Sequence, residues 1–366
     1  MLDETNCSQL NLTNKTCFSF SKTNFEAVIG TKTGVASLAA IACCAAVLLI
    51  VFFKAYKRFV HRLTLYLTIA ALTYSIISAL HMLPVKVRCG VVVVRSEQLC
   101  TALGFLVEYA SWVMLLLMSW ITIHLFVLAV FQRSYKSCKY EVGGIIICHV
   151  SPLLFNVVPF INFGNGTMYG LAGAWCWIRV TGESCQPYKE GLIEQFTLWY
   201  GPLMLIVLLA MVVMVIVLYR GTRETSDLLA STYQLQGQYK EALKEAMPLL
   251  FYPIFFNILC CLAIANRVYY AATNKANFPL WVAHAVAGPC LPLFIPVAFL
   301  LHPYTLQRMR CSQLRKAAKK WQRRDSLRSK THFVVSKEDV GTSGVKENLI
   351  VGQSKETTSQ YQSFFQ

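Results

Sequence analysis

The stretch GVASLAAIACCAAVLLIVFF, residues 34–53, carries no charged side chain. A helix of about 20 apolar residues is long enough to cross the roughly 30 Å hydrocarbon core of a bilayer. Further stretches of this kind follow along the chain, at residues 63–84, 99–132, 142–163, 195–219, 246–266 and 276–301. The sequence therefore predicts seven transmembrane helices.

The composition points to the same class of protein. The 366 residues are 55% hydrophobic and 14% charged, whereas a soluble domain normally has about 25% charged residues. Strands of a transmembrane barrel would be alternating segments of about ten residues, and the sequence has no such alternation. Prolines interrupt several segments, which membrane helices tolerate because neighbouring helices satisfy the freed backbone groups. We predict an all-α membrane protein, a seven-transmembrane helix bundle.

The basic residues predict the orientation of this bundle. With the N-terminus outside, 24 of the 34 Lys and Arg residues fall on the cytoplasmic side and 10 on the outer side, as the positive-inside rule requires. The net charge of +16 is then an asymmetry across a membrane, so we expect a lipid partner and no nucleic acid. The N-terminus is predicted to be extracellular and the C-terminus cytoplasmic, in a multi-pass protein of the plasma membrane.

Four N-x-S/T sequons fall on the predicted outer side, where glycosylation takes place. They are Asn6, Asn11, Asn14 and Asn165. The predicted segments are a glycosylated N-terminus, the bundle, an amphipathic helix and a disordered tail, at residues 1–30, 31–304, 305–324 and 325–366.

The chain changes character after the last span. Residues 305–324 set many Lys and Arg against Leu306, Met309 and other apolar residues, which predicts a short amphipathic helix on the anionic inner leaflet. A solvated basic tail is the alternative. Cys311 in this segment is a candidate palmitoylation site. Residues 325–366 are rich in Ser, Thr, Gln and Lys, a composition typical of disorder.

The tail also contains candidate phosphorylation sites. Phosphate groups there would give an arrestin-type partner a charged surface to bind. The candidates are Ser326, which follows two arginines in RRDS, and the distal cluster Thr357, Thr358, Ser359 and Ser363.

Six of the fourteen cysteines lie on the predicted outer side, which is an oxidising compartment. Cys100 begins the third span and Cys176 stands in the segment AGAWCWIR, so a bridge between them would pin the second outer loop over the mouth of the bundle. The natural remaining pairs are Cys89 with Cys185 and Cys7 with Cys17, although the sequence proves none of these pairings. No CxxC metal pattern is present, and we expect neither a metal nor a cofactor.

Seven spans with a cysteine at the start of the third and another in the second outer loop resemble a G-protein-coupled receptor. The W-C-W-I setting of Cys176 is similar to that of the cAMP-receptor-like branch and its secretin and adhesion relatives. The resemblance covers about residues 30–320, and it implies a receptor that activates a heterotrimeric G protein. The rhodopsin-like motifs are absent, because the third span ends in FQRSYK and the seventh in LLHPY. Their switch residues are therefore not carried over to this chain.

Polar residues inside the spans are costly and face the bundle interior or water. Glu108 lies eight residues past Cys100, about 12 Å along a helix, which is the depth of a ligand cavity in the outer half. An extracellular ligand of unknown identity is expected there. The candidate ligand-binding residues at this level are Glu108, Tyr109, Trp112, His81, Trp199, Arg267, Tyr270, Trp281 and His284.

Two interpretations of Glu108 are open at this point. It either pairs with Arg267 or a histidine as part of the structure, or contacts the ligand. A carboxylate among aromatic rings suits a cation, whereas Arg267 and the basic first outer loop suit an anion. Trp175 and Trp177 likewise either pack as structural rings at the loop–bundle junction or line the ligand entrance.

Basic residues near the inner ends of the spans are expected to contact the G protein. They are Arg133, Lys136, Arg220, Arg223 and Lys244. A light receptor of the opsin type needs a lysine for a retinal Schiff base, and residues 276–301 contain none, so a sensory alternative would be non-retinal. A transporter or channel is the other alternative, but no internal repeat of the kind common in transporters is present. An enzyme is not expected, because no HExxH motif or carboxylate cluster occurs.

Overall fold

A computed structural model describes residues 22–88, 91–131, 138–161, 168–179, 189–227, 247–273, 275, 277–301 and 305. The chain divides into two units, 1–308 and 309–366. The second unit lies outside the described residues, and the predicted amphipathic helix and tail lie there almost entirely.

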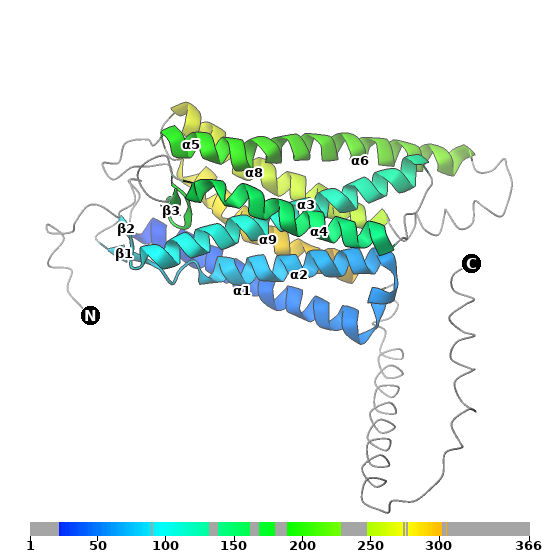
Figure 1. Cartoon of the computed structure of the whole chain (residues 1–366), viewed down its shortest axis with the longest axis horizontal. Helices are drawn as coiled ribbons and strands as arrows, with labels where there is room; N and C mark the ends of the chain where they lie inside the picture. Colours follow the sequence, from blue (N-terminus) through cyan, green and yellow to red (C-terminus); the bar gives the residue numbers. More distant parts are fainter. Residues whose placement is uncertain are drawn as a thin grey trace, which may run out of the picture. The chain divides into compact units, whose positions relative to one another are not determined.

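Seven helices in the described part of the chain are long and apolar enough to cross a membrane, which confirms the predicted fold class (Figure 1). The fifth consists of α5, a π-helical stretch η5 and α6, and the sixth begins with the 3-10 turn η6. The elements are α1 Lys22–Phe52, α2 Phe59–Leu80, α3 Glu97–Phe131, α4 Cys138–Asn156, α5 Lys189–Gln195, η5 Phe196–Tyr200, α6 Gly201–Asp227, η6 Met247–Leu250, α8 Phe251–Thr273 and α9 Phe278–Leu301. Two further 3-10 turns are η3 Ala55–Lys57 and η4 Val158–Phe160.

The first helix differs most from its predicted bounds. It begins at Lys22, twelve residues before the uncharged stretch and before the expected bundle boundary at residue 31. Hydropathy alone misses these residues because they include Glu26 and Lys32. Phe25 and Val28 are fully buried, so the apolar face of the helix already packs against the bundle in this polar stretch.

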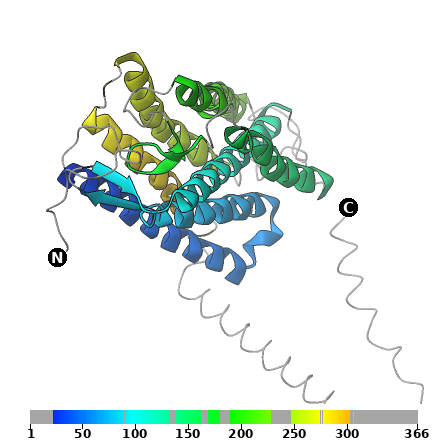
Figure 2. The ribbon, with the colours of Figure 1, turned by 60° about the vertical axis from the view of Figure 1, so that its left-hand side comes forward.

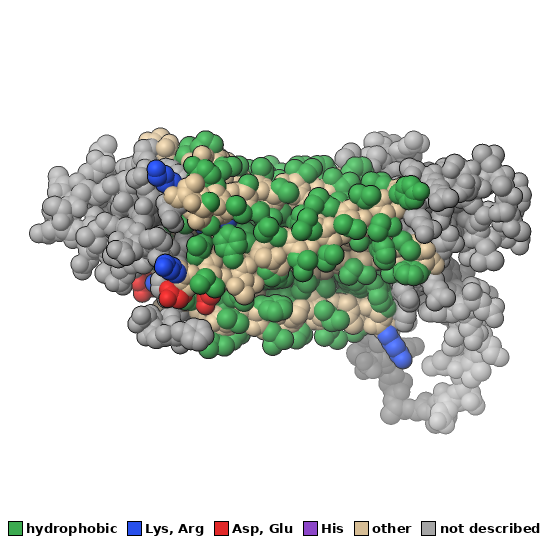
Figure 3. Space-filling view, turned by 90° about the horizontal axis from the view of Figure 1, so that it is seen from above, with side chains coloured by type: hydrophobic (Ala, Val, Ile, Leu, Met, Phe, Trp, Pro, Cys, Tyr) green, Lys and Arg blue, Asp and Glu red, His purple; other side chains and the backbone are tan. Residues whose placement is uncertain are grey.

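Helix α3 lies at the centre of the bundle. Of an 18-residue apolar stretch in α3, 67% is buried, whereas the share is 22% for the span that contains α4 and 22% for the fifth span. The exposed residues of the outlying helices are aliphatic, for example Leu205, Leu208 and Val212. Figure 3 shows hydrophobic side chains across the middle of the molecule and charged ones toward its two ends. This distribution suits a protein whose middle faces lipid.

Two short hairpins lie at one end of the bundle, which we call the hairpin end (Figures 1 and 2). Strands β1 Val85–Arg88 and β2 Val91–Val94 form the first, and β3 Tyr169–Leu171 and β4 Cys176–Ile178 form the second. The second hairpin turns through Gly173, whose φ of 91° is in the left-handed region that favours glycine.

The predicted disulfide between Cys100 and Cys176 is confirmed, with a Cα–Cα distance of 5.2 Å. It joins the beginning of α3 to the first residue of β4, so the second hairpin is held against the central helix. Both β3 and β4 contact α3 directly. The expected partners Cys7, Cys17, Cys89 and Cys185 lie outside the described residues.

Candidate functional site

A cavity of about 130 Å³ lies beneath the second hairpin. Among the described residues, its walls come from hairpin β3–β4 and from every membrane-length helix except α4. Most of the wall is apolar or aromatic, with a small number of polar groups, as is usual for ligand pockets. The polar and aromatic lining residues are Lys32, Tyr74, Glu108, Ser111, Trp175, Trp177, Trp199, Tyr200 and His284.

Trp175 closes the α1 side of this cavity. Its ring stacks on Trp281 with centroids 5.8 Å apart and meets the ring of His284 edge-on at 5.4 Å. Lys32 Nζ lies 4.4 Å from the centroid of the Trp175 ring, which is a cation–π contact. Lys32 therefore presents its charge to the cavity against the face of a tryptophan.

Trp177 lies on the α3 side and binds the carboxyl group of Glu108. Its indole N–H donates to Glu108 Oε2. The ring of Tyr200 meets Trp177 edge-on at 5.7 Å, and the guanidinium of Arg267 lies 5.5 Å from the Trp177 centroid. One indole thus contacts an acid through its edge and a base through its face.

Glu108 has only one of its carboxyl oxygens satisfied. The residue is 2% exposed, and Oε1 accepts no well-aligned hydrogen bond among the described residues, although the indole N–H of Trp112 lies near the carboxyl group. Arg267 is 3% exposed and donates from Nε to Tyr200 Oη at 3.2 Å, while its Nη2 has no partner in the described part of the chain. The structure therefore gives Glu108 a partner other than the expected Arg267.

The π-helical stretch η5 directs two adjacent aromatic residues into the cavity. Trp199 and Tyr200 both line it, and Trp199 meets Trp112 edge-on at 5.3 Å. π-Helical turns are rare and occur often at functional sites. Glycine follows the turn because a Cβ at Gly201 would lie 2.7 Å from the carbonyl oxygen of Phe196.

His81 links the end of α2 to the second hairpin. Its Nδ1 lies 3.0 Å from the carbonyl oxygen of Ile77, and its Nε2 lies 3.1 Å from that of Cys176. Burial, together with the positive charge of Lys32, lowers the pKa of His81 to about 3. The ring is therefore neutral at neutral pH and donates to one of the two carbonyl groups. Beside it, a smaller cavity of about 10 Å³ shares Lys32 and Trp175 with the main one.

The hydroxyl of Tyr169 is the second perturbed group outside the spans. It donates to the carbonyl oxygen of Asn156 at 3.2 Å, and burial raises its pKa above the usual range of tyrosine. Tyr169 is fully buried, so it anchors β3 to the end of α4.

The structure brings together most of the predicted ligand-binding residues. Glu108, Trp199 and His284 line the main cavity. The others pack behind its walls: Trp112 against Trp199, Trp281 against Trp175, Arg267 over Trp177, and His81 beneath Cys176.

Two predicted residues lie elsewhere. Tyr109 is on the other side of α3, in a separate cavity of about 300 Å³ between α2, α3 and α4, because successive helical residues are turned by about 100°. Tyr270 is half-buried and lines neither of these cavities. The two therefore belong to other parts of the molecule than the main cavity.

Lys32 lines the main cavity but was not predicted, because the predicted first span starts after it. The spacing of Phe25, Val28, Lys32, Ala36 and Ala39 follows one helical face, and four of these five are buried. This pattern is the signal that could have found it. Asn266 was also missed, and its amide nitrogen lies 3.0 Å from His284 Nδ1.

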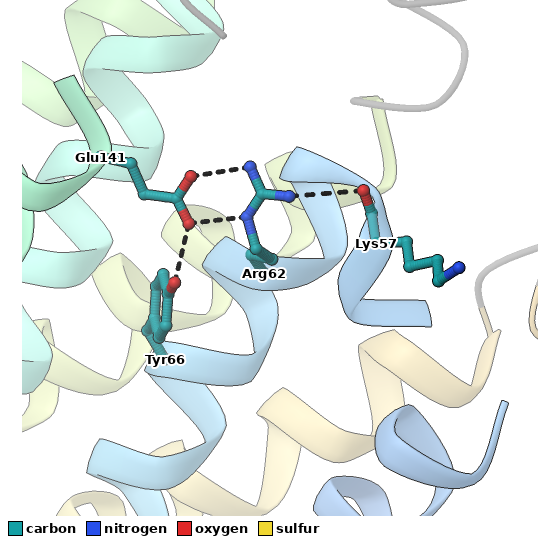
Figure 4. A network of polar contacts seen from close by, with 4 residues as sticks. All are labelled: Lys57, Arg62, Tyr66 and Glu141. Atoms are coloured by element: carbon teal, nitrogen blue, oxygen red, sulfur yellow. Dashed lines mark hydrogen bonds and ion pairs between the residues drawn. The ribbon is translucent and has the colours of Figure 1, made fainter. Parts of the chain in front are cut away.

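A salt bridge between Arg62 and Glu141 lies at the opposite end of the bundle (Figure 4). Arg62 of α2 binds Glu141 of α4 with two parallel hydrogen bonds, Nε to Oε1 at 2.6 Å and Nη2 to Oε2 at 2.7 Å. Tyr66 donates to Glu141 Oε1 at 2.7 Å, and Arg62 Nη1 donates to the carbonyl oxygen of Lys57 at 3.3 Å. This arrangement fastens α4 to α2 and to the turn η3.

Several predicted sites lie outside the described residues. Arg220 and Arg223 fall within helix α6, of which only the backbone is described there. The sites that fall outside entirely are Asn6, Asn11, Asn14, Asn165, Arg133, Lys136, Lys244, Cys311, Ser326, Thr357, Thr358, Ser359 and Ser363. The described residues contain no group of three or more His, Cys, Asp or Glu that could hold a metal ion.

Comparisons with known proteins agree with the seven-helix fold. The sequence model of the family described as "Slime mold cyclic AMP receptor" matches residues 23–316. Among solved structures, "Crystal structure of squid rhodopsin" is similar, with a TM-score of 0.53 and 13% sequence identity over 80% of this chain and 81% of that chain. At this identity the likeness shows the fold alone. No curated protein matches the sequence.

Proposed function

Because the chain belongs to the slime mold cyclic AMP receptor family, we propose that it is a cell-surface G-protein-coupled receptor. It binds an extracellular ligand beneath the second hairpin and activates a heterotrimeric G protein. Membership in this receptor family and seven membrane-length helices make it a multi-pass, receptor-like membrane protein. The ligand, the G protein and the plasma membrane are parts of the proposal.

The cavity beneath the second hairpin is the observation that carries this function. It reaches from the hairpin into the bundle, and its wall includes both a cation and a carboxyl group among aromatic rings. Small-molecule sites commonly combine such an apolar wall with a few polar groups that orient the ligand. The disulfide holds the hairpin over this cavity.

The orientation of the bundle is also proposed. The asymmetry of 24 basic residues against 10 supports an orientation with the hairpin end outside the cell. An epitope tag after residue 366 should then react with antibodies only after the cells are permeabilised. A tag that is accessible on intact cells would reverse the topology and exclude the receptor proposal.

A G-protein dissociation panel in cells tests the function itself. Cyclic AMP is the first probe, because the family is named for receptors of that nucleotide. We expect at least one G protein to dissociate, either with a probe or constitutively. Normal surface expression without dissociation of any G protein, in the presence of cyclic AMP and a wider set of extracellular metabolites, would contradict the proposal.

Glu108→Gln connects the signal to the cavity. The loss of one ionic hydrogen bond of about 1.5–3 kcal/mol would lower agonist potency roughly ten- to a hundredfold while surface expression stays normal. Unchanged expression with unchanged potency would remove Glu108 from both the structural and the ligand-binding role.

A further inference from the structure

We propose that the main cavity is built for an amphoteric ligand, one that carries an anionic group and a hydrogen-bond donor, preferably cationic, on a flat apolar body. Lys32 receives the anionic group and Glu108 receives the donor. The two tryptophans of the WCWI segment hold these charges apart. The inference rests on the proposed function, since it names the ligand class of the same cavity.

Trp175 and Trp177 each hold one of the two polar groups of the cavity. Trp175 lies in the bend just before β4, and Trp177 is the second residue of that strand. Both rings line the cavity, one beneath the ammonium group of Lys32 and the other bound to the carboxyl group of Glu108. A ligand that lies across the two rings can therefore meet Lys32 at one end and Glu108 at the other.

Lys32 and Glu108 have no ion-pair partner within the described part of the chain. Oε1 of Glu108 accepts no well-aligned hydrogen bond there, although the residue is 2% exposed. An unpaired charge in a buried site is costly. A protein that retains such groups inside a membrane span usually uses them for function.

The walls restrict the rest of the ligand. Trp175, Trp199 and Tyr200 offer aromatic faces and edges, which favour a flat body. A purely cationic ligand would leave its charge near Lys32, and a purely anionic ligand would leave its charge near Glu108. Only a molecule with an anionic group and a donor can bind Lys32 and Glu108 at the same time.

The thermal stability of the purified full-length receptor, without added ligand, tests the unpaired state of the two charges. Glu108→Gln keeps an acceptor for the Trp177 N–H and removes the charge, and Lys32→Met keeps the apolar stem. Each should raise the Tm of the empty receptor by about 2–4 °C. The matched controls are Glu141→Gln and Arg62→Met at the salt bridge, which should each lower the Tm. A lower or unchanged Tm for Glu108→Gln or Lys32→Met overturns the proposal.

Three matched probes test the ligand class on the wild-type receptor. L-Tryptophan carries both charges, tryptamine only the cation and indole-3-propionate only the anion. At the same millimolar concentration, L-tryptophan should give the largest rise in Tm, and either variant should abolish its advantage. An equal or larger rise with a singly charged probe, or no rise with any of the three, overturns the amphoteric class.

The G-protein readout separates this inference from the proposed function. A receptor that activates a G protein normally while Glu108→Gln and Lys32→Met lower its Tm would overturn the inference and leave the function standing. A receptor with the expected Tm changes that activates no G protein would contradict the proposed function instead.

Discussion

Both ends of the bundle place a basic and an acidic side chain on different helices, but only one end joins them. At the end opposite the hairpins, Arg62 and Glu141 form two parallel hydrogen bonds. At the hairpin end, Lys32 and Glu108 line one cavity, and each contacts a tryptophan. The joined pair connects α2 to α4, whereas the separated pair leaves polar atoms open to a ligand.

The residue types explain part of this difference. The guanidinium of arginine is a planar fork that matches a carboxylate, while lysine is a compact point charge. The side chains of Arg62 and Glu141 are 29% and 10% exposed, so Arg62 keeps part of its contact with water while it binds Glu141. Glu108 is 2% exposed and lies deep in a span. A structural pair there would require both charges to leave water, which is expensive.

Loss of the disulfide should lower stability most among the changes considered. The disulfide anchors the hairpin that holds Trp175 and Trp177, and these two residues contact Lys32 and Glu108. Cys176→Ala frees β4 from α3, and removal of a native disulfide typically costs about 2–5 kcal/mol. We expect a sharp loss of surface expression and of Tm, with the Arg62–Glu141 pair unable to compensate. Cys261→Ala, at an exposed free cysteine, is the control. Non-reduced peptide mapping that finds the thiols of Cys100 and Cys176 free would contradict the prediction.

The packing of α3 on α4 should rank second. Gly144 lies one turn after Glu141, and a Cβ there would lie 2.4 Å from Trp120 Cζ2. Gly144→Ala must push the helices apart, at a typical cost of about 1–3 kcal/mol for overpacking. A Cβ added at the neighbouring Gly143 would have no such contact within 4 Å, so Gly143→Ala should be neutral or slightly stabilising. Similar Tm values for the two variants would show that this contact does not position Glu141.

His81 allows a pH test confined to the hairpin end. Its pKa is lowered from 6.5 to about 3 in the folded protein by burial and by Lys32. Between these values the unfolded chain binds a proton that the folded chain does not, so stability falls as the pH drops below about 6.5. At pH 5.5 the loss attributable to His81 is about 1.4 kcal/mol.

The measurement is the Tm at pH 7.5 and at pH 5.5 for the wild type and for His81→Gln. The wild type should lose more stability on acidification, whatever the starting Tm of the variant. Equal losses would mean that His81 accepts a proton in the folded state, and the Nδ1 and Nε2 contacts would then both be donated hydrogen bonds.

Hydropathy is sufficient to predict the seven helices because each span needs only a run of apolar residues. The predicted topology also places Cys100 and Cys176 on the same side of the membrane, and the structure joins them. The contacts inside the cavity are harder to predict. Lys32 falls before the predicted first span because a lysine lowers local hydropathy, although its helix begins ten residues earlier.

The partner of Glu108 could not be predicted for a related reason. Opposite charges suggest a pair with Arg267, but the orientation of each side chain depends on hairpin β3–β4. The sequence does not give the distance of that hairpin from α3. Tyr109 shows the same limit, since a one-residue step from Glu108 turns its side chain into a different cavity.

The smallest expected effect gives the most direct comparison of the two pairs. In a double-mutant cycle, Arg62→Met with Glu141→Gln should give a coupling energy of about 0.2–1 kcal/mol, the usual range for a partly exposed pair. High salt should reduce this coupling, because Arg62 reaches solvent.

The corresponding cycle for Lys32→Met with Glu108→Gln should give a smaller coupling, because the structure shows no contact between these two side chains. Equal couplings from Tm measurements in the same detergent would mean that the cavity charges are joined in solution. Both ends of the bundle would then be held by structural pairs, and Glu108 would lose the free oxygen that a ligand requires.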